Sequence, residues 1–470
     1  IFFRTMSATQ AFLRWLVDNG VEGVGGGDSP VALYETEDGE RGILAAGPLA
    51  AKQVLAAVPL RLAIKDYDTA PISHLVYPGA PWSVRLAAQL MSLRRQAATP
   101  WAPYLAVLPK SVPSPLAGFG WRAVKALQYE PIEADLNELV WLATDARQQM
   151  QNAGHIKSEE DAELLEWALT LVHSRTFASA AREGGVGVRM MVPLIDLLNH
   201  SGDQERGAPG PSAEGRVAAT ENVEWRLRPP PGGDEGGVWY MELVTLNSVA
   251  DEEELVLSYG ERSNDDFLLH YGFVPPRNPH DDFVLFEDWD AASEWLRTTE
   301  GLPGYAVEAA GQVVEVVYRE PDEVIRQQPT ERQRNRLRLR RRGNRVDPRL
   351  KAGVEAAYGG DAAAAQAALG RRCRQLLEGY ATSLGGDLRF LCAQAGEVEE
   401  QEHALEALRR HYSTVGGPDP VLQVRPEGEE PCDAKAVEPA VLLAVTYRAY
   451  KKMILADFLF RGQSNYGVKR

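Results

Sequence analysis

Strand-like sequence occurs in two separate stretches of the chain, with a long helical pattern between them. The first stretch contains three short apolar runs bounded by turn residues, which are typical of strands: Val31–Tyr34, Gly42–Leu44 and Gln53–Val58. From Trp82 to Ala181, apolar residues recur instead at i, i+3 and i+4, the spacing of one helix face. Strand-like runs return between Met190 and Tyr259. The order predicts an α+β fold in which a helical insertion, at about residues 66–185, interrupts a β core.

Local signals predict the boundaries of several elements. Three helices are expected within the insertion: Arg85–Arg95, Leu136–Asn152 and Glu159–Arg175. Ser158 and Asp161 form a capping-box pattern at the start of the third helix. Residues 202–237 are rich in glycine and proline, which predicts a flexible loop around one strand at Val223–Leu227. Two further strands follow: Trp239–Leu246 and Glu254–Tyr259. From about Asp290 onward we expect mostly helix.

Composition and charge limit the class of protein. Apolar residues make up 44% and charged residues 25%, as is ordinary for a soluble globular chain. Lys and Arg number 50 against 66 Asp and Glu, and the net charge of −16 disfavours a nucleic-acid binder and suits a basic protein partner. Cys373, Cys392 and Cys432 are far apart and odd in number. We therefore expect no disulfide framework, no structural zinc cluster and a reducing compartment.

No membrane span is predicted. The best candidate segment is Val437–Phe460, and it contains Arg448, Lys451, Lys452 and Asp457, so it is interpreted as a packed amphipathic helix. The sequence begins at Ile1 and not at methionine, which indicates a processed or partial chain.

A densely basic run extends from Arg332 to Arg349. Two interpretations stay open from the sequence. The run is either a docking surface for an acidic partner or a solvated helix face or loop.

Several residues have types that suit the binding of a polar ligand. The planar guanidinium of Arg175 matches a carboxylate. Gly42 lets the backbone approach a ligand closely, and the Asn199 carboxamide both donates and accepts hydrogen bonds. Tyr259 ends an apolar strand and precedes Gly260. Taken singly, Arg175 is more simply a surface arginine, Gly42 a turn glycine and Tyr259 a core aromatic, and the neighbouring His200 is more simply a core histidine.

Taken together, three ordered segments resemble the SET-domain methyltransferases, in the branch of the Rubisco large-subunit lysine methyltransferase. Pro193–Ser201, PLIDLLNHS, is similar to the family's Asn-His motif, and Tyr259–Phe273, YGERSNDDFLLHYGF, is similar to its tyrosine motif. Glu40–Pro59 resembles the first SET motif. The resemblance implies a SET domain at residues 1–289 and an all-α substrate-binding domain at residues 290–470.

The resemblance also implies that S-adenosylmethionine (SAM) is the cofactor and assigns residues to it. Arg175 would bind its carboxylate. Asn199 would hold its amino group, and the backbone of His200 would meet its adenine. Gly42 and Glu40 would lie against its methionine part. Asp196 would order the loop that carries Asn199, and no metal is required.

The same resemblance makes Tyr259 the principal catalytic candidate, with Tyr271 and Phe273 lining the substrate channel. Ser263 and Asp266 form a second capping-box pattern, which predicts a short helix between the two tyrosines. That helix would return Tyr271 to the neighbourhood of Tyr259. Trp225 or Tyr240 is an open alternative for a further channel aromatic.

The expected activity is methyl transfer from SAM to a lysine of another protein. The resemblance implies a plastid protein such as the Rubisco large subunit or fructose-bisphosphate aldolase, and hence the chloroplast stroma, with cytoplasm or nucleus as alternatives. Two other functions stay open. Some relatives methylate histidine, and a SET-like chain without turnover would be a protein-binding module.

Overall fold

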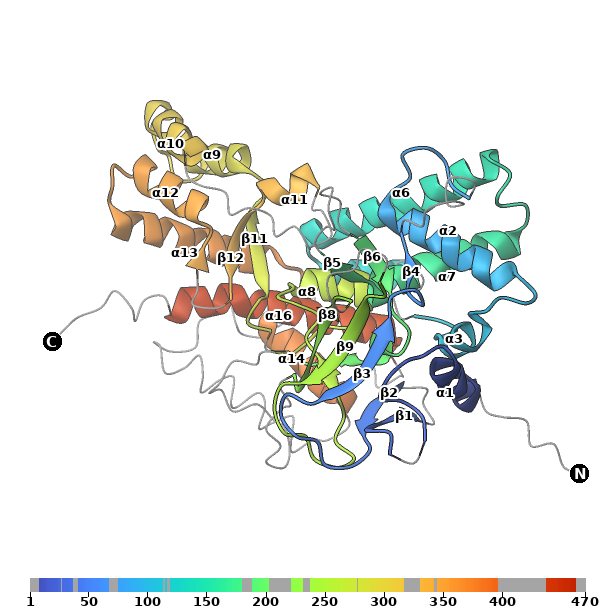
Figure 1. Ribbon diagram of the computed structural model, residues 1–470. Helices are drawn as coiled ribbons and strands as arrows, with labels where there is room; N and C mark the ends of the chain where they lie inside the picture. The colour runs from blue at the N-terminus through green and yellow to red at the C-terminus, as the bar shows by residue number, and fades with distance from the viewer. Residues whose placement is uncertain are drawn as a thin grey trace, which may run out of the picture. The chain divides into compact units, whose positions relative to one another are not determined.

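The computed structural model describes residues 8–26, 28–36, 41–66, 75–112, 115, 119–179, 188–202, 221–230, 237–276, 278–316, 330–341, 345–395 and 437–461. The chain forms two compact units (Figure 1). Unit 1 comprises Ile1–Ala117, Glu138–Asp203 and Val217–Gly260, and unit 2 comprises Gly118–Asn137, Gln204–Arg216 and Glu261–Arg470. The domain boundary expected after residue 289 stays a prediction.

The strands of unit 1 come from both sides of the helical insertion. They are β1 (Val31–Glu35), β2 (Arg41–Ala45), β3 (Val54–Pro59), β4 (Ile64–Lys65), β5 (Phe177–Ser179), β6 (Val188–Met191), β7 (Asn199–His200), β8 (Val223–Arg228), β9 (Tyr240–Thr245) and β10 (Val256–Leu257). They form a β1–β2 hairpin, a sheet of order β4-β6-β5 and a sheet of order β3-β9-β8-β10-β7. Because β3 pairs with β9 and β4 with β6, the predicted α+β fold with an interrupted β core is confirmed.

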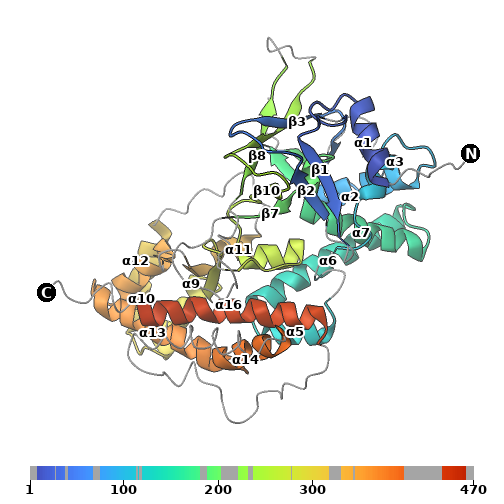
Figure 2. The same ribbon diagram turned by 90° about the horizontal axis from the view of Figure 1, so that it is seen from below.

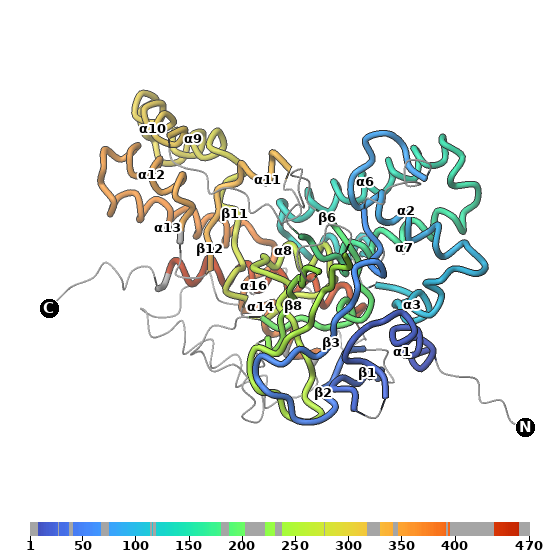
Figure 3. The backbone as a smooth tube through the Cα atoms, in the orientation of Figure 1, coloured from blue at the N-terminus to red at the C-terminus, as the bar shows by residue number. Residues whose placement is uncertain are grey.

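Helices cover this β core. Those of unit 1 are α1 (Ala8–Asp18), α2 (Trp82–Arg95), α3 (Ala102–Val107), α7 (Glu159–Arg175), the 3-10 helix η2 (Ile195–Leu197) and the part of α6 (Glu130–Asn152) after Asn137. Helices α2 and α7 lie side by side (Figure 3). The predicted cap of α7 is confirmed, since the Ser158 side chain accepts from the Asp161 amide.

The core of unit 1 is apolar. On one side of it Phe12, Trp15 and Tyr104 stack with ring centroids 6.0–6.5 Å apart. Leu86 and Leu90 of α2 are fully buried. Burial of side chains of this size stabilises the fold by roughly 1.5–3 kcal/mol each, so packing of this kind holds the helices on the sheets.

Unit 2 is mostly helical. Its elements are α5 (Trp121–Leu127), the first turns of α6, α8 (Asn264–Asp266), the π-helix η4 (Phe267–Tyr271), β11 (Asp282–Phe286), α9 (Trp289–Thr298), α10 (Gly304–Val316), α11 (Glu331–Asn335), β12 (Leu337–Arg340), β13 (Arg345–Val346), α12 (Pro348–Ala357), α13 (Ala362–Gly379), α14 (Leu384–Ala395) and α16 (Pro439–Arg461). Strands β11, β12 and β13 form a small antiparallel sheet. Figure 2 shows the long helix α16 alongside α5, α13 and α14.

Helix α16 is packed, as expected, but its charges do not face solvent. Lys451 and Lys452 are fully buried, and Arg448 is 7% exposed. Lys451 pairs with Asp265 and Asp281, at 2.5 and 2.7 Å. No helix in the described part of the chain is both long and apolar enough to span a bilayer.

The basic run is partly solvated and partly buried: helix α11 has no buried residue, whereas Arg336, Leu337 and Leu339 are buried. It contributes α11 and strand β12. Arg336 is buried and forms a bidentate ion pair with Asp135, while Arg338 forms an ion pair with Asp282. These arginines are therefore committed to ion pairs inside unit 2. The acidic partners lie far away in the sequence, where the basic run gives no sign of them.

One strand is shorter than predicted. Strand β10 comprises only Val256 and Leu257 of the expected strand Glu254–Tyr259, and Glu254 forms an isolated bridge with Leu44. The neighbouring strand β7 has two residues, so the ladder ends there. Tyr259 consequently lies beyond the strand.

Candidate functional site

Asn199 and His200 lie where a single 3-10 turn passes into a two-residue strand. Leu194, just before η2, has a φ of 75°, in the left-handed region. Such a backbone costs on the order of 1–3 kcal/mol for a non-glycine residue. The Leu194 side chain is fully buried, so core packing maintains the turn. Parallel pairing of Val256 with Asn199 and of Leu257 with His200 then fixes the direction of the strand.

The Asn199 carboxamide is held inside unit 1 by two acceptors. Its Nδ2 donates to the carbonyl oxygen of Arg41 and to Oε1 of Glu254, both at 2.8 Å. The same Glu254 oxygen accepts from the Tyr34 hydroxyl at 2.7 Å. Tyr34 and Glu254 are 220 residues apart in sequence, so this contact ties the first hairpin to the segment that precedes β10.

Gly42 is required by this arrangement. It stands opposite Tyr34 in the β1–β2 hairpin. A Cβ at this position would lie 2.5 Å from Cε1 of Tyr34 and 2.8 Å from Oε1 of Glu254. Any other residue would therefore displace the Tyr34–Glu254 pair. The close approach of Gly42 to a ligand stays a prediction beside this internal requirement.

Arg175 and Asp196 are brought together as well. Nη1 of Arg175 donates to the Asp196 carbonyl oxygen at 2.5 Å, and the Tyr104 hydroxyl donates to Oδ2 of Asp196 at 2.6 Å. Burial raises the pKa of Asp196 to about 6, although Arg175 and the hydrogen bond from Tyr104 act to lower it. Oδ1 of Asp196 and Nε of Arg175 are buried without a hydrogen-bond partner in the described part of the chain. Both residues thus keep unused bonding capacity.

Tyr259 contacts the Asn-His segment through both its side chain and its backbone amide. Its hydroxyl donates to the carbonyl oxygen of Leu198 at 2.7 Å, across 61 residues of sequence. Its amide donates to Nδ1 of His200 at 3.2 Å, and the two ring centroids are 5.0 Å apart. Because the phenol hydrogen is engaged with Leu198, the phenol oxygen can act toward a further group only as an acceptor.

Tyr271 and Phe273 belong to unit 2, where they cluster with a third ring. Ring centroids of Phe267, Tyr271 and Phe273 are 5.1–6.2 Å apart. The predicted cap is confirmed, since the Ser263 hydroxyl accepts from the Asp266 amide. The role of Tyr271 and Phe273 in a substrate channel stays a prediction.

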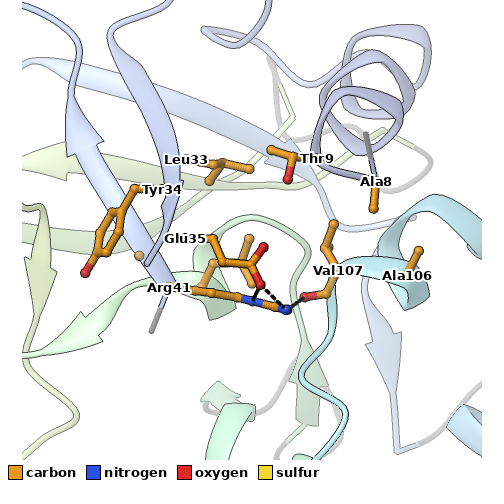
Figure 4. Close-up of a pocket in the computed structure, with 10 residues that line it drawn as sticks. Ala8, Thr9, Leu33, Tyr34, Glu35, Arg41, Ala106 and Val107 are labelled. Atoms are coloured by element: carbon orange, nitrogen blue, oxygen red, sulfur yellow. Dashed lines mark hydrogen bonds and ion pairs between the residues drawn. The ribbon is translucent and has the colours of Figure 1, made fainter. Parts of the chain in front are cut away.

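A pocket lies beside the β1–β2 hairpin, and Tyr34 and Gly42 are among its lining residues (Figure 4). Successive side chains of a strand point to opposite faces, and Figure 4 shows Tyr34 turned away from Glu35 and Arg41. Arg41 pairs with Glu35 at 2.6 Å and donates to the carbonyl oxygen of Val107 at 2.8 Å. Leu33 and Leu197 are among the other residues that line the pocket. The predicted site residue Glu40 lies outside the described residues.

The sequence did not single out Tyr34, Tyr104 or Glu254. A signal existed for Tyr34, because it lies in the first of the two strand-like runs that were expected to pair, and Gly42 lies in the second. Glu254 is one of four consecutive acidic residues, Asp251–Glu254, and nothing local distinguishes it from the others. Tyr104 lies in an apolar helix, where a core aromatic is the ordinary expectation.

Comparison with solved structures defines the fold as that of a SET domain. In particular, the fold is similar to that of LSMT, which confirms the sequence resemblance at the level of the fold. The structure of the SET domain of LSMT bound to lysine and AdoHcy matches with a TM-score of 0.59, covering 97% of this chain and 92% of that chain at 16% identity. A structure of Rubisco LSMT bound to AdoMet matches with a TM-score of 0.58 at 14% identity, covering 98% of this chain and 92% of that chain.

Curated relatives match over parts of the chain. Actin-histidine N-methyltransferase of Danio rerio is 25% identical over 210 residues, which are 42% of this chain and 30% of the relative. Protein SET DOMAIN GROUP 40 of Arabidopsis thaliana is 24% identical over 323 residues, 61% of this chain and 63% of the relative. The chain thus spans less than two thirds of the length of these relatives. No family model matches it.

Proposed function

We propose that this chain is a SAM-dependent protein methyltransferase, with a lysine side chain as the first candidate acceptor. One observation carries the proposal. On a SET-domain fold, the Tyr259 hydroxyl rests on the carbonyl of Leu198, the residue next to Asn199. The two motifs implied by the resemblance therefore meet in space, as a methyl-transfer site requires.

The residues of unit 1 suit the amino-acid end of SAM. Arg175 would bind the carboxylate through its guanidinium, since its buried Nε has no partner in the described part of the chain. Asn199 would hold the ammonium group, and the main chain of His200 the adenine. Gly42 and Glu40 would border the methionine part. The likeness to LSMT structures bound to AdoMet and to AdoHcy supports this cofactor.

Bound SAM supplies a methyl group on a positively charged sulfur, and its transfer leaves S-adenosylhomocysteine. The chain contributes positioning and desolvation. The phenol oxygen of Tyr259, with its hydrogen engaged by Leu198, would accept a hydrogen bond from the acceptor amine. A lysine ammonium has an ordinary pKa of about 10.4, and burial beside aromatic rings favours its neutral, nucleophilic form. The displaced proton leaves to solvent.

A histidine acceptor is the second candidate. The curated relatives include actin-histidine N-methyltransferases of several vertebrates, which favours it. A histidine acceptor would need a partner that sets its tautomer. For a lysine acceptor we propose a plastid target, such as the Rubisco large subunit or fructose-bisphosphate aldolase, and a stromal location, on the likeness to Rubisco LSMT.

The test is transfer of labelled methyl from SAM by the purified chain. Rubisco, aldolase, actin and a stromal extract would serve as acceptors, and amino-acid analysis after hydrolysis separates methyllysine from methylhistidine. We expect Tyr259→Phe to lower transfer roughly tenfold or more through loss of its hydroxyl contact. Tyr305→Phe, at an exposed tyrosine of α10, is the matched control and should leave transfer unchanged.

Each outcome decides between the functions. Label in methyllysine that is lost in Tyr259→Phe supports the first proposal, and label in methylhistidine selects the second. Binding of SAM without label on any acceptor would favour a binding module. A chain that does not bind SAM would refute the cofactor assignment.

A further inference from the structure

The neighbours of Asn199 determine which way its carboxamide faces. The carbonyl oxygen of Arg41 and the carboxylate of Glu254 can only accept hydrogen bonds from it. The Tyr34 hydroxyl has already donated its hydrogen to Glu254. The NH₂ group must therefore point at these acceptors, and an exchange of the amide nitrogen and oxygen would set oxygen against oxygen. Both NH₂ hydrogens are thereby used.

The Asn199 carboxamide can therefore act toward a ligand only as a hydrogen-bond acceptor. With Nδ2 engaged, only Oδ1 is available, and Oδ1 is an acceptor. An acceptor suits an ammonium group and opposes a carboxylate. Glu254 thus determines that the Asn199 carboxamide presents its oxygen, and not its NH₂ group, to a ligand. Tyr34 in turn holds Glu254 in place.

We infer that Glu254, fixed by Tyr34, is a positioning residue that orients Asn199 to select the ammonium group of the cofactor. The inference rests on the proposed function for the identity of the ligand and assigns two residues to its recognition. It also accounts for Gly42, since a side chain there would displace Tyr34 and Glu254. The three residues act together. Gly42 leaves room for the hydrogen-bonded Tyr34 hydroxyl and Glu254 carboxylate, and Glu254 orients the Asn199 carboxamide.

Binding of two nucleosides distinguishes a role of Glu254 in recognising the ammonium group from a general role in stabilising the fold. S-adenosylhomocysteine carries the ammonium group, whereas 5′-methylthioadenosine has the same adenosine but no amino-acid part. Binding of both would be measured by calorimetry, without any methyl transfer. We expect Glu254→Leu to weaken S-adenosylhomocysteine binding about tenfold, because Asn199 can then turn. Binding of 5′-methylthioadenosine should be unchanged.

A conservative variant tests whether orientation or charge is responsible. In Glu254→Gln the side-chain oxygen can still accept from both Tyr34 and Asn199, and affinity for S-adenosylhomocysteine should stay within about threefold of wild type. An equal loss in Glu254→Gln and Glu254→Leu would mean that the negative charge itself attracts the ammonium, which overturns the inference. Equal weakening of both nucleosides by Glu254→Leu would also overturn it, because that indicates a merely structural role.

A double mutant shows whether Glu254 acts through Asn199. In an Asn199→Ala background, Glu254→Leu should cause no further loss of affinity, and additive losses would contradict the inference. If Glu254→Leu does not fold, Tyr34→Phe gives the same contrast between nucleosides at about threefold. Failure of the wild type to bind either nucleoside refutes both this inference and the cofactor site. Binding in the expected pattern without methyl transfer supports the inference and refutes only the activity.

Discussion

The two units differ in what they bury. Unit 2 buries Arg336, Arg448, Lys451 and Lys452, each at 7% exposure or less. Unit 1 buries no lysine or arginine among the residues that the structure describes, and its core is made of aliphatic and aromatic side chains. Unit 1 buries carboxylates such as Asp66 and Glu242, but their arginine partners stay partly exposed, whereas unit 2 buries both members of several ion pairs.

The difference shows how each kind of interior specifies structure. Apolar side chains pack in many combinations of similar volume. A buried charge has far fewer acceptable positions, because it needs its counter-ion. Lys451 contacts Asp265, Asp281 and the carbonyl oxygen of Asp282. Rotation or sliding of α16 would therefore leave a buried charge without its counter-ion. We infer that the ion pairs define the register of α16 more than they add to net stability.

The largest effect should come from breaking that network. Lys451→Met leaves Asp265 and Asp281 buried without their cation, which should destabilise unit 2 by about 3–5 kcal/mol. Hydrogen exchange of α16 amides, followed by mass spectrometry, measures the loss. Protection of α2 in unit 1 serves as the internal reference. If the α16 amides of this variant were as protected as those of the wild type, unit 2 would not depend on its buried charges.

A cavity in unit 1 should cost nearly as much by a different route. Leu90 of α2 is fully buried, and Leu90→Ala should destabilise unit 1 by about 3 kcal/mol through lost burial and the space left behind. Because no charge is involved, the loss measured by exchange of α2 amides should be the same at low and high salt. A strong salt dependence would mean that unit 1 also relies on electrostatics.

The carboxylate of Asp196 makes a smaller, pH-dependent contribution. Burial raises its folded-state pKa to about 6, above its unfolded value, so the folded state binds its proton more tightly. This contribution is complete below about pH 4 and is lost as pH rises to about 6, on the order of 2 kcal/mol. Tyr104 and Arg175 face this group. Unfolding of unit 1 across that range, compared with Asp196→Asn, gives the measurement, and parallel curves would refute it.

The smallest effect is expected at a surface pair of unit 2. Lys351 and Glu355 lie 3.9 Å apart on α12, and both side chains reach solvent. Lys351→Met should change stability by less than about 0.5 kcal/mol. It is the same substitution as at Lys451, so exchange in the two variants isolates the effect of burial. Similar losses at both positions would remove the distinction between buried and exposed charge.

Local signals predicted much of the fold, and distant partners account for what they missed. Ser158 and Ser263 were identifiable as caps because their partners lie three residues away. Arg336 was not identifiable as buried, since Asp135 is 201 residues distant. The strand before Tyr259 was overestimated because its length depends on the shortness of β7, which no local pattern shows.

The candidate site shows the same division. Arg175, Asn199 and Tyr259 were found because their motifs resemble a family, and the structure gathers these three in unit 1. Tyr34 and Glu254 act on Asn199 through contacts across 165 and 55 residues. Their role follows only once the hairpin and the last strand are placed beside β7.

The π-helical turn Phe267–Tyr271 ends its helix at Tyr271, with Gly272 as the left-handed cap. A π turn holds one residue more than an α turn, and one residue corresponds to about 100° of rotation in an α-helix. Because the wider π turn absorbs its extra residue within one full turn, removal of a single residue, such as Leu268, would relax it to an α turn and leave Tyr271 near its present angle. The segment between the two tyrosines therefore holds one residue more than an α-helical turn would allow, and the change in turn width keeps the direction of the Tyr271 ring nearly constant.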